Sequence, residues 1–292
     1  MKIAFAILSC DYPSAHFKKL LERLSEFGDS VIYIHHDYSQ NEFDNSLKER
    51  YHIVLSDKTY ITHWSHINNV KATWDIFKNA MSGYNPDWII TLTPTCYPIK
   101  PTYQIEQFLQ NAEYDGFMTY RKVTSTPIWE LDKWIYRDMY HRKFILPIIN
   151  RPIFLKRRGS KVPFNNDFAI WHGSNYFMLN NKSVSSLLGE EATYLRLVKF
   201  YDGFKTDNQH PCPQEIVIQS ILMNNCKHLN INQDYHRFIK WRDGVWSPEY
   251  LDEKYFNEIC SSNALFARKF KSPLSDSLTD LIDRTLLNKK SI

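Results

Sequence analysis

The N-terminal third of the chain alternates between short apolar runs and segments with helical periodicity. The apolar runs predict buried strands at 3–9, 31–36 and 87–92. Between them, apolar residues recur every three or four positions, which predicts helices at about 15–27 and 66–81. Strands separated by helices are typical of βαβ units, so we predict an α/β fold with a Rossmann-like, mostly parallel sheet.

Ligands of such sheets bind beyond the carboxyl ends of the strands. Functional side chains are therefore expected first in the stretches 9–11, 35–37 and 93–100, which follow the predicted strands. The adjacent His35 and His36 do not predict a metal site, because neighbouring residues of a strand point to opposite faces.

The middle of the chain, at 120–166, is basic and rich in proline and aromatic residues, and it has no clear period. We expect an insertion or lid there. Regular structure, ending in two amphipathic helices, is expected to resume with elements at 167–171, 175–179 and 213–224, near Leu229 and near Phe238. No linker rich in Gly or Ser divides the chain, so residues 1–292 are interpreted as a single domain.

Composition fits a folded enzyme-sized domain. Hydrophobic residues make up 43% of the 292 residues and aromatic residues 15%, so a core can form without disulfides or a structural metal. The aromatic excess suits stacking on bases or sugar rings, although an aromatic-rich core is the alternative. The five cysteines are widely spaced with no C-x-x-C pair, and neither a signal peptide nor a membrane-length apolar run is present, which predicts a cytoplasmic protein.

The net charge of +4 is unevenly distributed. Residues 142–161 are rich in Lys and Arg, contain no Asp or Glu, and surround an apolar stretch. This segment could contact anionic lipid at the inner face of the membrane or an acidic substrate. A solvated basic loop is the alternative, since Pro147 and Pro152 interrupt any long helix. No nucleic-acid-reading motif accompanies the basic residues, so nucleic acid is not expected as a partner.

Six blocks of sequence, taken together, resemble a known family. They lie at 63–81, 87–109, 173–179, 212–225, 237–241 and 263–270. In order and spacing they resemble the core-2/I-branching β-1,6-N-acetylglucosaminyltransferases and their xylosyltransferase relatives, over nearly the whole chain except 120–166. The resemblance implies a GT-A fold and inverting transfer from a UDP-sugar to an oligosaccharide or lipid-linked glycan. We expect a bacterial member that acts in polysaccharide biosynthesis and needs no cofactor.

Metal-dependent GT-A enzymes present an Asp-x-Asp motif, because hard oxygen ligands hold Mg²⁺ or Mn²⁺ against the diphosphate. This sequence contains no Asp-x-Asp, and Cys96 stands in TPTCYPIK where the family usually has an Asp. We therefore expect no metal. A metal-dependent or retaining transferase, with an acidic pair elsewhere, is one alternative, and a non-catalytic nucleotide-sugar or carbohydrate-binding protein is another.

Without a metal, fixed cations must stabilise the departing diphosphate. Arg268 and Lys269 stand between apolar residues in LFARKF. The resemblance implies that Lys269 contacts the diphosphate. The family's earlier Arg falls near Trp246 here, so Arg268 is expected to replace it. From the residues alone, surface charges beside an edge strand are the alternative.

An inverting displacement needs one general base and no nucleophile. The resemblance implies that Glu215 is this base, in a Cys-Pro-Gln-Glu segment where the family commonly has Pro-Asp-Glu. Gln214 replaces the Asp. The alternative is an ordinary helix start, since Pro213 and a first-turn acid are both favoured there.

The remaining site residues also follow from the resemblance. Acceptor contacts are expected from Trp241 and Tyr176, and donor contacts from Asp37, Ser9, Cys10 and Trp64. From the residues alone, a core position for Trp241 and a turn after a strand for Asp37 are the alternatives. The expected donor sugar is N-acetylglucosamine, followed by xylose or another hexose.

Overall fold

The structure is a computed structural model. It describes residues 1–123, 140–146, 151–156, 163–165, 167–203, 212–245 and 247–288, and in 140–146 and 151–156 it describes the backbone alone.

A seven-stranded sheet forms the centre of the molecule, in the order β12-β6-β11-β4-β1-β2-β3. All strands of this sheet run in the same direction except β11, which is antiparallel to both of its neighbours, β4 and β6. The strands are β1 (Ile3–Ser9), β2 (Ser30–His36), β3 (Ile53–Leu55), β4 (Trp88–Leu92), β6 (Gly116–Phe117), β11 (Met178–Asn180) and β12 (Ile231–Asn232). This sheet confirms the predicted Rossmann-like α/β fold class.

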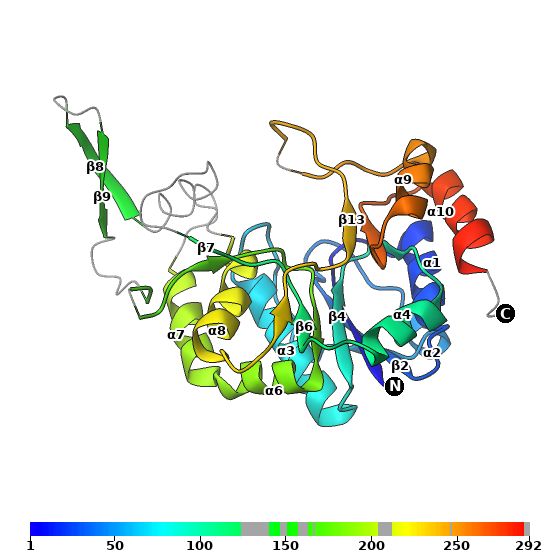
Figure 1. Ribbon diagram of the computed structural model, residues 1–292, viewed down its shortest axis with the longest axis horizontal. Helices are drawn as coiled ribbons and strands as arrows, with labels where there is room; N and C mark the ends of the chain where they lie inside the picture. Colours follow the sequence, from blue (N-terminus) through cyan, green and yellow to red (C-terminus); the bar gives the residue numbers. More distant parts are fainter. Residues whose placement is uncertain are drawn as a thin grey trace.

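The apolar runs become central strands because both of their faces are covered. Along β1, Phe5 belongs to one hydrophobic cluster and its neighbours Ala4 and Ala6 belong to the other. This alternation follows from the two-residue period of a strand. Helix α1 (Ala15–Leu24) packs in the first cluster and α3 (Asn68–Gly83) in the second, on opposite sides of the sheet (Figure 1).

The other helices complete these two layers (Figure 1). On the α3 side lie α6 (Asn181–Gly189), α7 (Glu191–Tyr201) and α8 (Val217–Asn225). On the α1 side lie α2 (Ser46–Arg50), α4 (Thr102–Gln110), α9 (Phe256–Ser261) and α10 (Asp276–Ile282), with the short turns η2 (Glu253–Tyr255) and η3 (Asp283–Leu287).

A small second sheet is important for the site. It has the order β13-β14-β5, formed by β13 (Arg237–Ile239), β14 (Phe266–Arg268) and β5 (Cys96–Pro98). Because β5 follows β4 closely in the chain, this sheet brings the C-terminal part of the chain to the carboxyl end of the central sheet.

Several predicted elements have different limits in the structure. The helix expected at 213–224 is split into a 3₁₀ turn, η1 (Pro213–Glu215), and α8, because Ile216 has φ −128° and interrupts the helical backbone. The strand expected at 167–171 is reduced to β10 (Trp171–His172), which pairs with β7 (Arg121–Lys122). The first helix ends at Leu24, earlier than expected.

In the region predicted as an insertion, the structure shows an antiparallel hairpin of β8 (Tyr140–Leu146) and β9 (Arg151–Lys156), which extends away from the central sheet in Figure 1. The side chains of 142–161 lie outside the described residues, so contact with anionic membranes stays a prediction, as does the cytoplasmic location. Within the described ranges, no helix is both long enough and apolar enough to cross a membrane. Cys10, Cys96, Cys226 and Cys260 are free thiols.

Candidate active site

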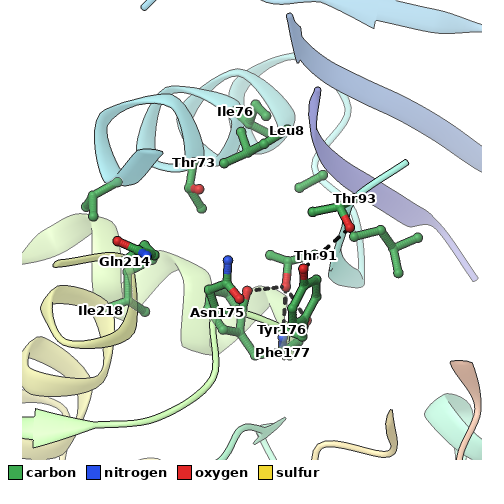
Figure 2. A pocket seen from close by; sticks show the side chains of 13 residues that line it. Leu8, Thr73, Ile76, Thr91, Thr93, Asn175, Tyr176, Phe177, Gln214 and Ile218 are labelled. Carbon is green, nitrogen blue, oxygen red and sulfur yellow. Dashed lines mark hydrogen bonds between the residues drawn. The ribbon is translucent and has the colours of Figure 1, made fainter. Parts of the chain in front are cut away.

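A pocket opens at the carboxyl ends of β1 and β4, between helix α3 and the start of α8 (Figure 2). Its lining includes Leu8, Thr73, Thr93, Tyr176 and Gln214. The Thr91 hydroxyl forms part of the pocket floor and donates hydrogen bonds to the backbone carbonyls of Asn175 and Phe177. The pocket therefore lies where a parallel sheet is expected to bind its ligand.

Glu215 ends the turn η1, immediately after the pocket residue Gln214. Its carbonyl accepts a hydrogen bond from the Gly173 N–H at 2.9 Å. A Cβ on Gly173 would lie 1.8 Å from the Thr119 carbonyl oxygen, so only glycine permits this close approach. The Glu215 carboxylate meets His172 Nε2 at 3.1 Å, and its side chain is 34% exposed. The predicted base is thus fixed through its backbone and remains accessible to a ligand.

Tyr176 is a buried wall of the pocket, with its hydroxyl 3.4 Å from Thr93 Oγ1. The Arg268 guanidinium lies over its ring, 4.4 Å from the ring centre. Burial raises the pKa of Tyr176 to about 12, although Arg268 opposes this shift. The phenol is therefore neutral at physiological pH and can donate a hydrogen bond.

The two predicted diphosphate cations point to different neighbours. Arg268 is opposite Cys96 in the β14–β5 pairing and faces Tyr176. Lys269 Nζ instead bonds Ser247 Oγ at 2.9 Å and lies 4.3 Å from the ring centre of Tyr250. The two side chains therefore contact different residues.

Lys271 is a residue that the sequence reasoning missed. Its ammonium lies 4.4 Å from the ring centre of Tyr250, as the Lys269 ammonium lies 4.3 Å from it. Both lysines therefore lie against one aromatic ring, which the tertiary structure and not a local sequence pattern reveals.

Arg237 was also missed, although its sequence block was used to predict Trp241. Its side chain is buried, lies over the ring of Phe266 at 4.7 Å, and reaches the Thr91 carbonyl at 3.4 Å. Burial lowers its pKa to about 10, which leaves it charged at neutral pH. No carboxylate forms a salt bridge with it within the described ranges. Arg237 therefore adds uncompensated positive charge behind the pocket floor.

The predicted nucleotide-side residues lie at the ends of β1 and β2. The buried Asp37 carboxylate accepts hydrogen bonds from the backbone and hydroxyl groups of Ser39 and Thr62. Burial alone would raise the pKa of Asp37, but these hydrogen bonds hold it well below its usual range. The Asp37 carboxylate thus connects the loop after β2 with the loop before α3. Its contact with uridine stays a prediction.

Ser9 and Cys10 lie at the neighbouring strand end. Ser9 Oγ is 2.7 Å from His36 Nδ1, and the Cys10 carbonyl accepts from Asn41 at 3.1 Å. Burial raises the pKa of the Cys10 thiol, with a further contribution from nearby acids. His35 accepts a hydrogen bond from the Tyr60 N–H instead, so His35 and His36 face different neighbours, as expected for adjacent strand residues.

Replacing Asp37 by Asn is expected to destabilise the protein by about 1–3 kcal/mol. The NH₂ group of the new amide is itself a donor, and it would face the N–H and O–H donors of Ser39 and Thr62 without an acceptor between them. The folded-state pKa is depressed, so this contribution is complete at neutral pH and is lost as pH falls below about 4. Urea unfolding at pH 7 should therefore separate the variant from wild type more than unfolding at pH 3. The exposed Asp243→Asn variant is the control, and equal stabilities at pH 7 would contradict the prediction.

Both predicted tryptophan contacts are exposed. Trp241 is 59% exposed just beyond β13, and Trp64 is 62% exposed in the loop before α3. The core position considered for Trp241 is therefore wrong. In the part of the chain that the structure describes, no three His, Cys, Asp or Glu side chains are arranged to hold a metal ion.

A mostly parallel sheet with a pocket, a fixed carboxylate and nearby cations at its carboxyl edge defines an α/β enzyme. The family model described as Core-2/I-Branching enzyme matches residues 3–265, so the chain belongs to this family. It is therefore a glycosyltransferase, with a nucleotide-sugar donor and a glycan acceptor. This confirms the resemblance and, with the observed sheet, the GT-A fold class.

Two solved structures are similar to this chain at low sequence identity. The 4-diphosphocytidyl-2C-methyl-D-erythritol synthase from Anaerococcus prevotii shares 9% identity, with 79% of this chain and 87% of that chain covered, at a TM-score of 0.36. The bifunctional IspDF from Campylobacter jejuni shares 8% identity, with 64% and 43% covered, at a TM-score of 0.31. No curated protein matches the chain.

Proposed function

We propose that this chain is an inverting, metal-independent glycosyltransferase that moves N-acetylglucosamine from its UDP-sugar to a hydroxyl of an oligosaccharide or lipid-linked glycan. The observation that carries the proposal is the Glu215 carboxylate, which stands accessible beside the pocket with one oxygen near His172. Such a group suits the single base that an inverting displacement requires.

In the proposed reaction, the acceptor oxygen forms a bond to the anomeric carbon while the bond from that carbon to the diphosphate oxygen breaks. The acceptor proton passes to Glu215, and the electron pair of the broken bond leaves with UDP. No covalent intermediate on the protein forms, which gives inversion at the anomeric carbon.

Negative charge grows on the diphosphate as that bond breaks, and fixed cations stabilise it. We assign this role to Lys269 and Arg268, at the end of β14. Buried Arg237 adds to the positive potential at the pocket floor, where a low dielectric strengthens its effect. These charges, together with the missing Asp-x-Asp, support catalysis without a metal.

The other contacts follow from the positions of the side chains. Trp241 offers an exposed ring that can stack on an acceptor sugar, and the neutral Tyr176 hydroxyl can donate to a sugar oxygen. Ser9, Cys10, Asp37 and Trp64 lie at or near the ends of β1 and β2, on the side proposed for the nucleotide.

Transfer is expected to persist in millimolar EDTA, because the proposed site neutralises the diphosphate with side-chain cations. The measurement is release of UDP with a panel of UDP-sugars and glycan acceptors, with and without chelator, followed by linkage analysis of the product. Loss of activity in EDTA, restored by Mg²⁺ or Mn²⁺, would contradict metal independence. Preference for UDP-xylose or another UDP-hexose would change the donor, and binding without any UDP release would indicate a non-catalytic binding protein.

A further inference from the structure

His172 and Glu215 are each other's only side-chain hydrogen-bond partner within the described residues. His172 Nε2 lies 3.1 Å from Glu215 Oε2, and no other side-chain hydrogen bond of either residue is found there. The His172 side chain is 12% exposed, so water competes little for this contact, while Glu215 is 34% exposed. The histidine therefore contacts the carboxylate from the more protected side.

The backbone around His172 is held on both sides. The Trp171 N–H bonds Ser220 Oγ at 3.0 Å, and the Gly173 N–H bonds the Glu215 carbonyl at 2.9 Å. His172 itself pairs with Arg121 between β10 and β7. These bonds connect β10 to η1 and α8, which fixes the histidine relative to the carboxylate.

We propose that His172 is a positioning residue for the base. The proposal rests on the function proposed above, in which Glu215 takes the acceptor proton. In the tautomer that carries a proton on Nε2, the imidazole donates to Glu215 Oε2 and restricts rotation of the carboxyl group. Oε1 then remains as the oxygen that accepts the proton from the acceptor hydroxyl.

This arrangement matters because the rate depends on how often base and hydroxyl meet in a productive geometry. A misplacement of about 1 Å can lower a rate by about 10²-fold. A histidine that holds one carboxylate oxygen limits such misplacement without itself contacting the substrate.

The test compares three variants at the same position, His172→Ala, His172→Gln and His172→Asn. The Gln amide nitrogen can replace Nε2 as a donor, whereas the shorter Asn amide can reach only the position of Nδ1. We expect kcat to fall by about 10²-fold in the Ala and Asn variants, with the KM for the donor nearly unchanged. The Gln variant should recover most of the lost rate.

A split between kcat and KM separates positioning from a purely structural role. A histidine that acts through the Glu215 carboxylate changes kcat and leaves the KM for the donor nearly unchanged. A purely structural role would instead lower the thermal stability of all three variants alike, so thermal unfolding is measured beside the kinetics.

Wild-type kcat in His172→Ala would overturn the proposal, as would equal losses in the Gln and Asn variants. If the Ala variant fails to fold, the comparison of Gln with Asn still decides. Adding His172→Ala to Glu215→Gln should cause no further loss, because the histidine acts through the carboxylate. Full activity of Glu215→Gln alone would instead overturn the assignment of the base, which distinguishes the two failures.

Discussion

Replacing Glu215 by Gln is expected to lower kcat by about 10²–10⁴-fold, the usual cost of losing general-base catalysis. The amide keeps the shape of the side chain but cannot accept the acceptor proton. The dissociation constant of the UDP-sugar should hardly change, because the loss lies in the chemical step. Single-turnover transfer and calorimetric donor binding measure the two quantities separately.

Glu191→Gln is a matched control, since Glu191 begins α7 and pairs with Lys78 at the surface. Wild-type turnover in Glu215→Gln would assign the base to another acid. Glu249 already pairs with Arg242 at 3.0 Å, and Asp207 lies outside the described residues. Loss of both turnover and thermal stability would mean that Glu215 supports the start of the helix, through its place in the turn η1.

Replacing Lys269 by Ala is expected to weaken donor binding and turnover together, lowering kcat/KM by about 10–100-fold. A hydrogen bond to a charged group contributes about 1.5–3 kcal/mol, which corresponds to this range. The ammonium is expected to contact the diphosphate in the bound donor and in the departing UDP, so both KM and kcat should change. Steady-state kinetics with a saturating acceptor measure both.

The control for this variant is Lys182→Ala, which removes a lysine that pairs with Asp115 near the amino end of β4. Lys271→Ala should have a smaller effect of the same kind, because Lys271 shares the ring of Tyr250 with Lys269. Full activity of Lys269→Ala would remove this residue from the diphosphate site and leave Arg268 as the cation to test.

The local sequence was sufficient to predict β1, β2 and β4 of the central sheet. Buried parallel strands need apolar residues on both faces, and β1, β2 and β4 appear as continuous apolar runs for that reason. Helices α1 and α3 need only one apolar stripe, which the three-to-four-residue spacing shows directly. The order of the six family blocks identified the class of enzyme. It also led to the prediction of Glu215 as the base, from a short segment of the chain.

The arrangement around Glu215 depends on contacts between segments far apart in the sequence. His172 reaches Glu215 because β10 is bonded to α8, and Arg237 lies behind the pocket because β13 pairs with β14. Neither pairing has a local sequence pattern, since each of these strands has only two or three residues. The sequence showed Arg268 and Lys269 as neighbours, and only the structure showed that Arg268 contacts Tyr176 whereas Lys269 contacts Ser247 and Tyr250. Sequence periodicity records which faces are buried, whereas the partner of each polar side chain is decided when distant segments pack together.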